Sequence, residues 1–452
     1  MLSVLRWSPE RLARRLNAFA ERQGLPDRIH PKTPYKWVTP QAQPRLPRQP
    51  WPSLIAALLT ETLQREITPA DLGWPADDID AVPADTGLIV PWNAEGTLRA
   101  LRAVTEAGDM DRRMFLMLVG SAATSPAHEW LIAHTAGPGA ARTAGTRVPL
   151  EVVDHLDRIT ARLRRMDDQL GGGQLLELVH HHLRYVTGLL KQHSYTEVVG
   201  RRLHSTVAEL LRLAGFISFD SGLHPRAQRY WIAALHAAQA AGDRALGANV
   251  LGFWSCQAKD IGQIREAVTL AQTARAGYGG ASPEITAILE LRVAEAHAND
   301  KAVTQAREAI DAAFEALTKA PSSGAPDWCY WMDEAQAHAQ AGYCYLKLGD
   351  HTRARGHLRH GLTLQDTTYS REGALRHILL AITYLQQPHP ELDQALTHGS
   401  LALDALASEI DSARCLGHLS RLVNALRSYR RSAGVAEFIA RARLVFTSDA
   451  LA

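Results

Sequence analysis

The chain has 452 residues, of which 46% are hydrophobic and 21% charged, and its formal net charge is +2. This composition is that of a folded globular protein, and the near-neutral charge excludes a chain that binds polyanions over its whole surface. The four cysteines form no C-x-x-C pair and the N-terminus lacks a signal peptide's apolar core, so we expect a reducing, cytoplasmic location.

The N-terminal segment begins with a helix signal at Ser8-Pro9-Glu10, where a capping serine precedes a proline at the first helical position. Leu12, Leu16 and Phe19 recur at helical spacing, which predicts a helix with one buried face. Gly24 is expected to end it.

The charge of this segment differs from that of the chain. Residues 1–50 hold ten Lys or Arg and three Asp or Glu, whereas residues 66–111 hold two Arg and ten acidic residues. A basic head followed by an acidic segment favours a localised anionic partner for the head.

Residues 1–75 resemble lambda-repressor-like helix-turn-helix domains in their order of elements. A second helix is expected to start at Thr33-Pro34, followed by a proline-rich turn over residues 40–52, a helix over 52–65 and a short helix over 68–72. The residues that match the family pattern are Thr33, Tyr35, Lys36, Trp37, Arg45, Pro47 and Trp51. The resemblance implies that the N-terminus of the second helix enters the major groove of double-stranded DNA.

The expected DNA contacts are short polar or cationic side chains: Lys32, Thr33, Tyr35, Lys36, Arg45 and Arg48. The cationic members suit phosphates, which supply affinity without reading sequence. The head departs from the pattern because its scaffold helix is reduced to residues 26–30 and its turn holds five prolines. The alternative is a small helical domain whose basic face is only solvated.

Residues 76–149 are expected to form an acidic linker with a buried helix around residues 110–135. The Arg112-Arg113 pair and the apolar run after it resemble a twin-arginine export signal, but the run is far shorter than the ~20 residues of a membrane span. We therefore interpret it as part of the buried helix and not as an export signal.

The C-terminal region, residues 150–452, carries a helical repeat. Two amphipathic helices, over residues 151–170 and 174–192, are expected to cap the array or to form a divergent first repeat. The segment from Ala341 to Leu358 resembles a tetratricopeptide unit closely: Gly342 is small, Tyr345 is aromatic, and Gly349 marks the turn between the two helices.

Small residues that let the second helix of each unit approach the first recur along the chain. These anchors are Ala227, Ala267, Ala306, Ala354, Ala395 and Ala436. Their spacing is about 40 residues, longer than the usual 34, and the widest gap contains a loop insertion at residues 321–326. The alternative is a helical bundle without repeats.

The whole chain is similar to a family of actinobacterial, Streptomyces-type transcriptional regulators. The segments that carry the resemblance are the head motif at residues 30–37, Ala70-Asp-Leu-Gly-Trp74, the Arg112-Arg113 helix and the long repeats. It implies an all-α fold in which a small helix-turn-helix-like domain precedes a right-handed tetratricopeptide-type α-solenoid. It also implies control of transcription.

Solenoids of this type bind ligands along the concave face made by the first helix of each unit. Alignment on the anchors places these side chains there: Glu209, Arg212, Phe216, Asn249, Glu295, Gln336, Tyr343, His377, Tyr384, His418 and Arg421. Most are polar, and amide side chains can pair with both groups of an extended peptide backbone. The alternative is that they are groove residues facing water.

In similar two-part proteins of Gram-positive bacteria, the repeat groove binds a signalling peptide that rearranges the DNA-binding heads. This resemblance implies a ligand-gated, homodimeric DNA-binding regulator whose groove senses a peptide, another ligand or a partner protein. The alternative is an adaptor whose repeats bind a partner protein and whose head does not touch DNA.

Enzymatic chemistry is not indicated by any motif. The sequence contains no G-x-x-x-x-G-K-[ST], H-E-x-x-H or G-x-S-x-G motif, and no cofactor is predicted. No metal site is predicted either: His180-His-His182 would point in different directions on a helix, and His357 and His360 have no third ligand at matching spacing. These histidines are interpreted as facing solvent.

Overall fold

The computed structural model describes residues 5, 7–22, 28–38, 51, 55, 58–59, 62, 67, 72, 90–105, 117–133, 146–170, 173–280, 282–319, 325–366, 370–408 and 412–448. Within these residues the fold is all-α, and the one β-type contact is an isolated bridge between Arg147 and Ser194. The chain forms two compact units, one of residues 1–89 and 108–118 and one of residues 90–107 and 119–452.

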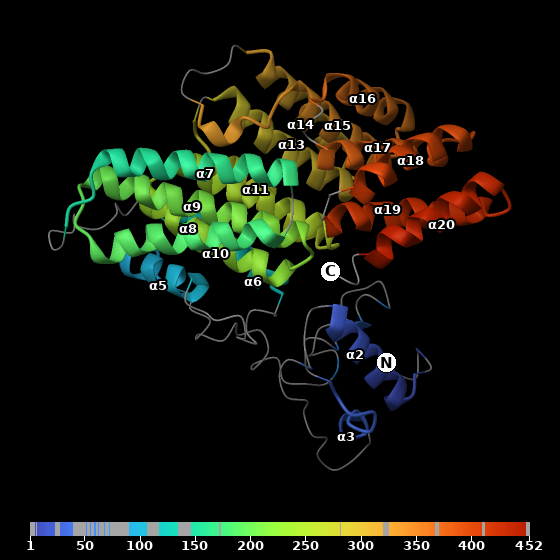
Figure 1. The fold of residues 1–452 in the computed structure, drawn as a ribbon, viewed down its shortest axis with the longest axis horizontal. Helices are drawn as coiled ribbons and strands as arrows, with labels where there is room; N and C mark the ends of the chain where they lie inside the picture. Colours follow the sequence, from blue (N-terminus) through green and yellow to red (C-terminus); the bar gives the residue numbers. More distant parts are fainter. Residues whose placement is uncertain are drawn as a thin grey trace. The chain divides into compact units, whose positions relative to one another are not determined.

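The first unit contains α2 (Pro9–Arg22) and the single turn α3 (Tyr35–Val38) (Figure 1). The prediction that α2 starts at Ser8-Pro9 is confirmed, because the Ser8 hydroxyl accepts a hydrogen bond from the Arg11 amide at 3.2 Å. Asn17 of α2 pairs with both backbone groups of Ile29, at 3.0 and 2.9 Å, and so fixes the segment that leads to α3.

The apolar face of α2 supplies most of the small core of this unit. The buried members that the structure describes are Trp7, Leu12, Ala13, Leu16, Phe19, Ala20, Ile29, Ile55, Leu58, Leu59 and Ile67. The predicted buried face of Leu12, Leu16 and Phe19 is therefore confirmed, and residues on both sides of the proline-rich turn share one core.

The second unit is a solenoid of helix pairs, which confirms the predicted fold class (Figure 1). Its helices in chain order are α5 (Ala94–Thr105), α6 (Ser121–Ile132), α7 (Leu150–Leu170), α8 (Gly173–Gln192), α9 (Glu197–Asp220), α10 (His224–Ala241), α11 (Arg244–Asp260), α12 (Ile264–Gly277), α13 (Pro283–Asn299), α14 (Val303–Leu317), η4 (Asp327–Cys329), α15 (Glu334–Leu348), α16 (His351–Leu364), α17 (Ser370–Gln386), α18 (Leu392–Ser408), α19 (Ala413–Leu426), η5 (Arg427–Tyr429) and α20 (Ala433–Ser448). Each odd-numbered helix from α9 to α17 packs mainly on the next helix, and also contacts the first helix of the following pair.

Every anchor alanine is the fourth residue of the second helix of a pair. In all six pairs the amide of the anchor donates the first hydrogen bond of that helix, to the carbonyl four residues before it. Five anchors are fully buried, but Ala436 is exposed and its neighbour Val435 is buried instead. The last anchor is therefore shifted by one residue, because α20 packs only on α18 and α19 and no later described pair covers it.

The best predicted repeat unit shows why small residues and glycines stand where they do. A Cβ added at Gly342 of α15 would lie 2.7 Å from Leu358 of α16, so the two helices approach too closely for a larger residue. Gly349 ends α15 in the left-handed region, at φ 81°, and Asp350 then caps α16.

The expected linker differs from the structure because two of its segments belong to the solenoid. Helix α5 packs on α8 and α10, and α6 packs on α10 and α12. Trp130 of α6 is fully buried against Gly247 and Gly277, and Arg244 stacks on its ring at 3.9 Å. The first part of the helix expected around residues 110–135, at 110–116, lies outside the described residues.

The solenoid coils far enough for late helices to contact early ones: α17 contacts α7, and α19 contacts α9. The contact is ionic. Arg371 of α17 bonds Asp167 of α7 at 3.1 Å and Asp220 of α9 at 3.4 Å, and Arg414 of α19 bonds Asp220 at 2.9 Å. We call Asp167, Asp220, Arg371, Glu372 and Arg414 the closure network.

The segment that follows the predicted loop insertion also contacts α7, whereas residues 321–324 of the insertion itself lie outside the described residues. Asp327 of η4 pairs with Arg165 at 3.0 Å and with Arg164, and the Tyr330 hydroxyl donates to Asp168. No helix among the described residues combines the length and apolar character that crossing a membrane requires.

Candidate functional site

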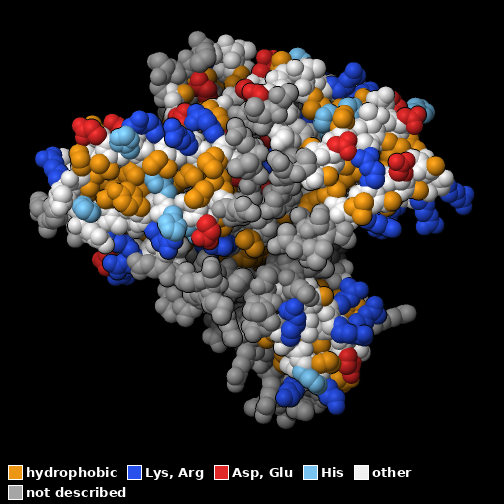
Figure 2. Space-filling view, viewed as in Figure 1, with side chains coloured by type: hydrophobic (Ala, Val, Ile, Leu, Met, Phe, Trp, Pro, Cys, Tyr) orange, Lys and Arg blue, Asp and Glu red, His pale blue; other side chains and the backbone are white. Residues whose placement is uncertain are grey.

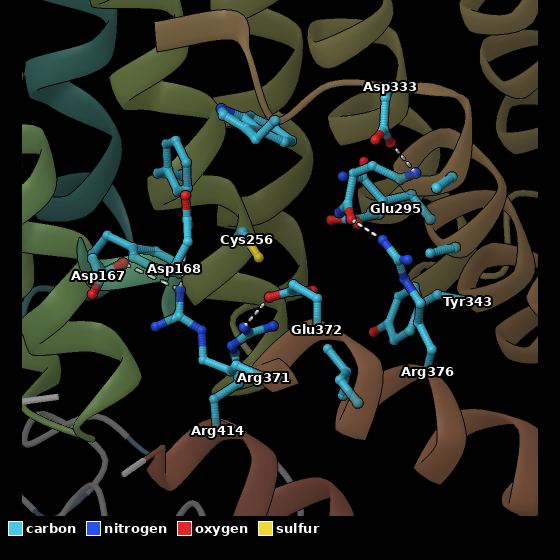
Figure 3. A pocket seen from close by; sticks show the side chains of 18 of the residues that line it. Asp167, Asp168, Cys256, Glu295, Asp333, Tyr343, Arg371, Glu372, Arg376 and Arg414 are labelled. Atoms are coloured by element: carbon cyan, nitrogen blue, oxygen red, sulfur yellow. Dashed lines mark hydrogen bonds and ion pairs between the residues drawn. The ribbon is translucent and has the colours of Figure 1, made fainter. Parts of the chain in front are cut away.

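The first helices of the coiled pairs surround a chamber of about 140 Å³. Helices α7, α9, α11, α13, α15, α17 and α19 all contribute side chains, and the segment between η4 and α15 adds Tyr330 and Trp331. Figure 3 shows Arg371 and Arg414 on one side of this space, and Tyr343 and Arg376 on the other. One face of each first helix reaches the chamber because its lining residues recur three or four positions apart, as Arg212 and Phe216 do on α9.

The closure network forms one side of the chamber wall. Arg414 bonds Glu372 at 2.8 Å and Asp220 at 2.9 Å, and Ser412 adds a bond to Asp220 at 3.0 Å. Burial by itself would raise the pKa of Glu372, but Arg414 and Arg371 lower it to about 2. These acids therefore hold the two arginines as structural cations.

A second ionic group lies on α11 and α13. Lys259 bonds Asp260 at 2.9 Å, lies 3.9 Å from Glu295, and faces the Tyr343 ring at 4.5 Å. Arg292 pairs with Glu295 at 3.0 Å. Burial by itself would lower the pKa of Lys259, but Asp260 and the other neighbours of Lys259 raise this pKa well above its usual value. Both cations of this group are thus compensated by carboxylates.

Arg212 is different, because no described carboxylate pairs with it directly. It is only 5% exposed and lines the chamber, and its side chain makes neither a hydrogen bond nor an ion pair with any described residue. Its guanidinium lies 5.0 Å from the centre of the Phe253 ring. Burial and the nearby Arg164 lower the pKa of Arg212, and the carboxylates of Glu209 and Asp167 oppose this shift without pairing with the guanidinium. A buried cation without a paired carboxylate is costly, so the surroundings of Arg212 favour an added negative charge.

Two further polar side chains share this property in part. Gln340 of α15 is 5% exposed, lines the chamber, and has no partner among the described residues for either its oxygen or its nitrogen. Arg376 of α17 bonds the amide oxygens of Gln336 at 2.7 Å and Gln365 at 2.8 Å but pairs with no described carboxylate. Buried polar groups in native proteins nearly always have partners, so these groups mark a binding surface.

Aromatic rings lie beside the cations. Arg292 lies 5.4 Å from the Phe253 ring and 5.9 Å from the Trp331 ring, and Arg371 lies 5.1 Å from the Phe216 ring. Cation–π contacts hold guanidinium groups in place without neutralising them. The chamber lining therefore holds cations and carboxylates in equal number, together with a free amide group and flat apolar faces. Near Arg212 and Arg376, where the cations pair with no described carboxylate, this combination suits a compact anion.

The structure brings together six of the side chains predicted for the groove. Those that line the chamber are Arg212, Phe216, Glu295, Gln336, Tyr343 and His418. Glu209 contributes indirectly, because its carboxylate pairs with the lining residue Arg164. Burial raises the pKa of Glu209 to about 7, although Arg164 opposes this shift.

Four predicted groove residues do not line the chamber. Asn249 is buried within the helix packing, and Arg421 is exposed. His377 and Tyr384 both contact His398 of α18, so they face the partner helix of their own pair. The prediction placed groove residues at the same distance from the anchor in every repeat. This rule fails because the helices tilt along the coil. Helices α17 and α19 line the chamber with their N-terminal halves, whereas α9, α11 and α13 line it with their C-terminal halves.

Sequence reasoning missed the residues that arrive from distant helices, among them Asp167, Arg371, Arg376 and Arg414. Asp167, Arg371 and Arg414 stand near a helix end, where charged side chains are usually exposed. Arg371, Glu372 and Arg376 at helical spacing form a charged stripe on one face of α17. This stripe was the sequence pattern that could have predicted these chamber residues, but the same pattern is typical of a helix face exposed to solvent.

In the head, Lys32 and Lys36 are exposed and Thr33 is half-buried. Tyr35 is exposed, but its hydroxyl donates to Glu10 of α2. Arg45 and Arg48 lie outside the described residues. Exposed Lys and Arg side chains cover much of the visible described surface of the head (Figure 2).

Comparison with known proteins bears mainly on the head. Residues 1–75 match the family model described as the SP15 N-terminal domain, which covers less than half of the chain. No curated protein matches this chain significantly.

Proposed function

We propose that this protein is a cytoplasmic DNA-binding transcriptional regulator in which the solenoid chamber senses a ligand. The observation that carries the sensing function is Arg212, a cation buried in the chamber wall without a carboxylate partner among the described residues. A scaffold that needed only to pack would be more stable with an apolar residue at this place.

The ligand that fits this wall is a compact anion, such as a carboxylate or phosphate compound or the charged end of a peptide. Arg212 and Arg376 supply the positive charge, and Gln340 supplies a free donor and acceptor. A ligand acts as a switch only if it binds two arrangements of the protein unequally. The walls of the chamber come from both ends of the coil, so we propose that a ligand there favours the closed arrangement of the coil.

DNA binding is proposed for the head on the basis of its charge and its resemblance to helix-turn-helix domains. Lys32 and Lys36 are exposed beside the start of α3, where they are accessible to phosphates. We propose a homodimer, which would place two heads on two half-sites. The alternative is an adaptor whose repeats bind a protein partner.

Ligand sensing is tested by thermal unfolding of the full chain with citrate, inorganic phosphate and adenosine monophosphate. We expect at least one of these anions to raise the melting temperature of the wild type and to lose this effect in Arg212→Met. Arg421→Met, an exposed arginine outside the chamber, is the matched control and should respond like the wild type. No response to any anion, or an unchanged response in Arg212→Met, would contradict the proposal.

DNA binding is tested by retention of genomic DNA fragments on the full chain at two salt concentrations. A regulator should retain selected fragments, and more weakly at high salt. Lys32→Ala with Lys36→Ala should reduce retention, whereas Arg430→Ala with Arg431→Ala, which removes the same charge from the solenoid, should not. If only the adaptor function is correct, neither pair changes retention and no fragment is selected.

A further inference from the structure

Three histidines and a glutamate meet on the α15–α16 pair, and none of the four lines the chamber. Glu334 and His338 are one helical turn apart on α15, and His357 and His360 are one turn apart on α16. The two helices pack against each other (Figure 1). Side chains of the two pairs meet between them, because His338 contacts His357 and Glu334 contacts His360. The spacing of His357 and His360 was visible in the sequence, but the partners that complete it come from the preceding helix.

The potential ligand atoms lie close together. Glu334 Oε1 is 3.8 Å from His338 Nε2 and 3.7 Å from His360 Nε2, and one ligand atom from each residue lies within 4.8 Å of the other two. Tetrahedral zinc bonds of ~2.0–2.1 Å place ligand atoms about 3.3 Å apart. Small side-chain rotations therefore suffice to bring these atoms to coordination distance. Two of the side chains have room to rotate, because Glu334 is 68% exposed and His360 is 49% exposed.

His357 supports this arrangement from behind. Its Nδ1 lies 2.9 Å from His338 Nδ1, so one of the two nitrogens must donate to the other. If His338 used Nε2 as a ligand, its Nδ1 would carry the proton and donate to His357. Metal-bound histidines usually donate their second nitrogen in this way, which fixes the ring and its tautomer. Phe314 packs against the rings of His338 and His357, with centroids 4.9 and 5.7 Å away, and restrains both.

We propose that Glu334, His338 and His360 form a site for a divalent transition metal of the zinc class, with His357 orienting His338. Two imidazoles and one carboxylate are a ligand set that zinc uses in proteins, and imidazole ligands disfavour magnesium and calcium. Three protein ligands leave a fourth position for water. A metal at this place would link the N-terminal turn of α15 to the C-terminal half of α16.

The next repeat provides an internal control. His377 of α17 and His398 of α18 form a similar pair, with Nδ1 atoms 3.0 Å apart, and His398 is the repeat equivalent of His357. The position equivalent to His360 is Leu401, and the residue one turn before His377 is Gly373. This second pair has the supporting histidine contact without the other two ligands, so it should not bind metal.

The experiment is isothermal titration of the full chain with Zn²⁺, with Mg²⁺ as the comparison metal. We expect one zinc site in the wild type that Mg²⁺ does not fill, and affinity reduced about tenfold or more in His360→Ala and Glu334→Gln. His357→Phe keeps an aromatic ring but removes the acceptor, and should weaken zinc binding by about 10–100-fold. The matched control His377→Phe should bind zinc like the wild type.

Unfolding of a variant is separated from loss of a ligand by measuring the melting temperature without metal. Because His360 and Glu334 are largely exposed, their variants should melt like the wild type in the absence of zinc and gain less stability when zinc is added. Absence of a zinc site, equal zinc affinity in His360→Ala, or an equal loss in His377→Phe would each overturn the proposal.

Discussion

The closure network and Arg212 both lie in the wall of the same chamber, but the buried arginines differ in whether a carboxylate pairs with them. In the closure network, Arg371 and Arg414 share Asp220 and each has at least one further carboxylate. Arg212, in contrast, faces a phenylalanine ring and pairs with no described carboxylate. The comparison teaches that a buried arginine is a structural part where carboxylates surround it, and is available for a ligand where they do not.

The largest expected effect comes from breaking the shared carboxylate. Asp220→Ala removes the carboxylate that the buried Arg371 and Arg414 share. We therefore expect a loss of about 3–5 kcal/mol in the free energy of unfolding. Asp404→Ala breaks the exposed pair with Arg441 and should cost under about 1 kcal/mol. Urea unfolding followed by circular dichroism measures both. Equal losses in the two variants would mean that the closure network does not hold the coil.

The next effect concerns His418, a buried residue in the same wall near Asp260, Arg421, Lys259 and Arg414. Burial lowers the pKa of His418 to about 3, below its ordinary value of 6.5. Below about pH 6.5, His418 therefore binds a proton in the unfolded chain but not in the folded chain. The free energy of unfolding falls as the pH decreases through this range.

For this single group the loss is about 1.4 kcal/mol per pH unit. His418→Gln should reduce the fall in unfolding free energy between pH 7 and pH 5, whereas the exposed control His181→Gln should leave it unchanged. Unfolding curves at pH 7, 6 and 5 give the slopes. A slope that is the same in His418→Gln and the wild type would show that His418 is protonated in the folded chain.

The smallest effect is the most direct test of the comparison. Arg212→Met removes a buried charge that pairs with no described carboxylate, so the free energy of unfolding should stay constant or rise by about 1 kcal/mol without added anions. Arg371→Met makes the same change within the closure network and should instead destabilise the chain, because Asp167 and Asp220 lose a partner. If Arg212→Met is as unstable as Arg371→Met, Arg212 is a structural residue.

Local rules in the sequence determined much of this protein. The helix start at Ser8, the turn at Gly349 and Asp350, and the helix positions of the anchors all follow from side chains that act within a few residues of their own backbone. The polar character of the inner face was also predictable, and Arg212, Gln336 and Tyr343 do line the chamber.

The tertiary structure alone decided which side chains meet. Arg371 contacts Asp167 from a helix more than 200 residues away, and Glu334 reaches His360 only because α15 and α16 pack as a pair. These contacts depend on the tilt and coil of the whole solenoid. Small packing angles add up over successive helix pairs, so equivalent side chains lie in the chamber wall in one repeat and against a neighbouring helix in another. A fixed spacing of residues in the sequence does not predict this accumulated rotation.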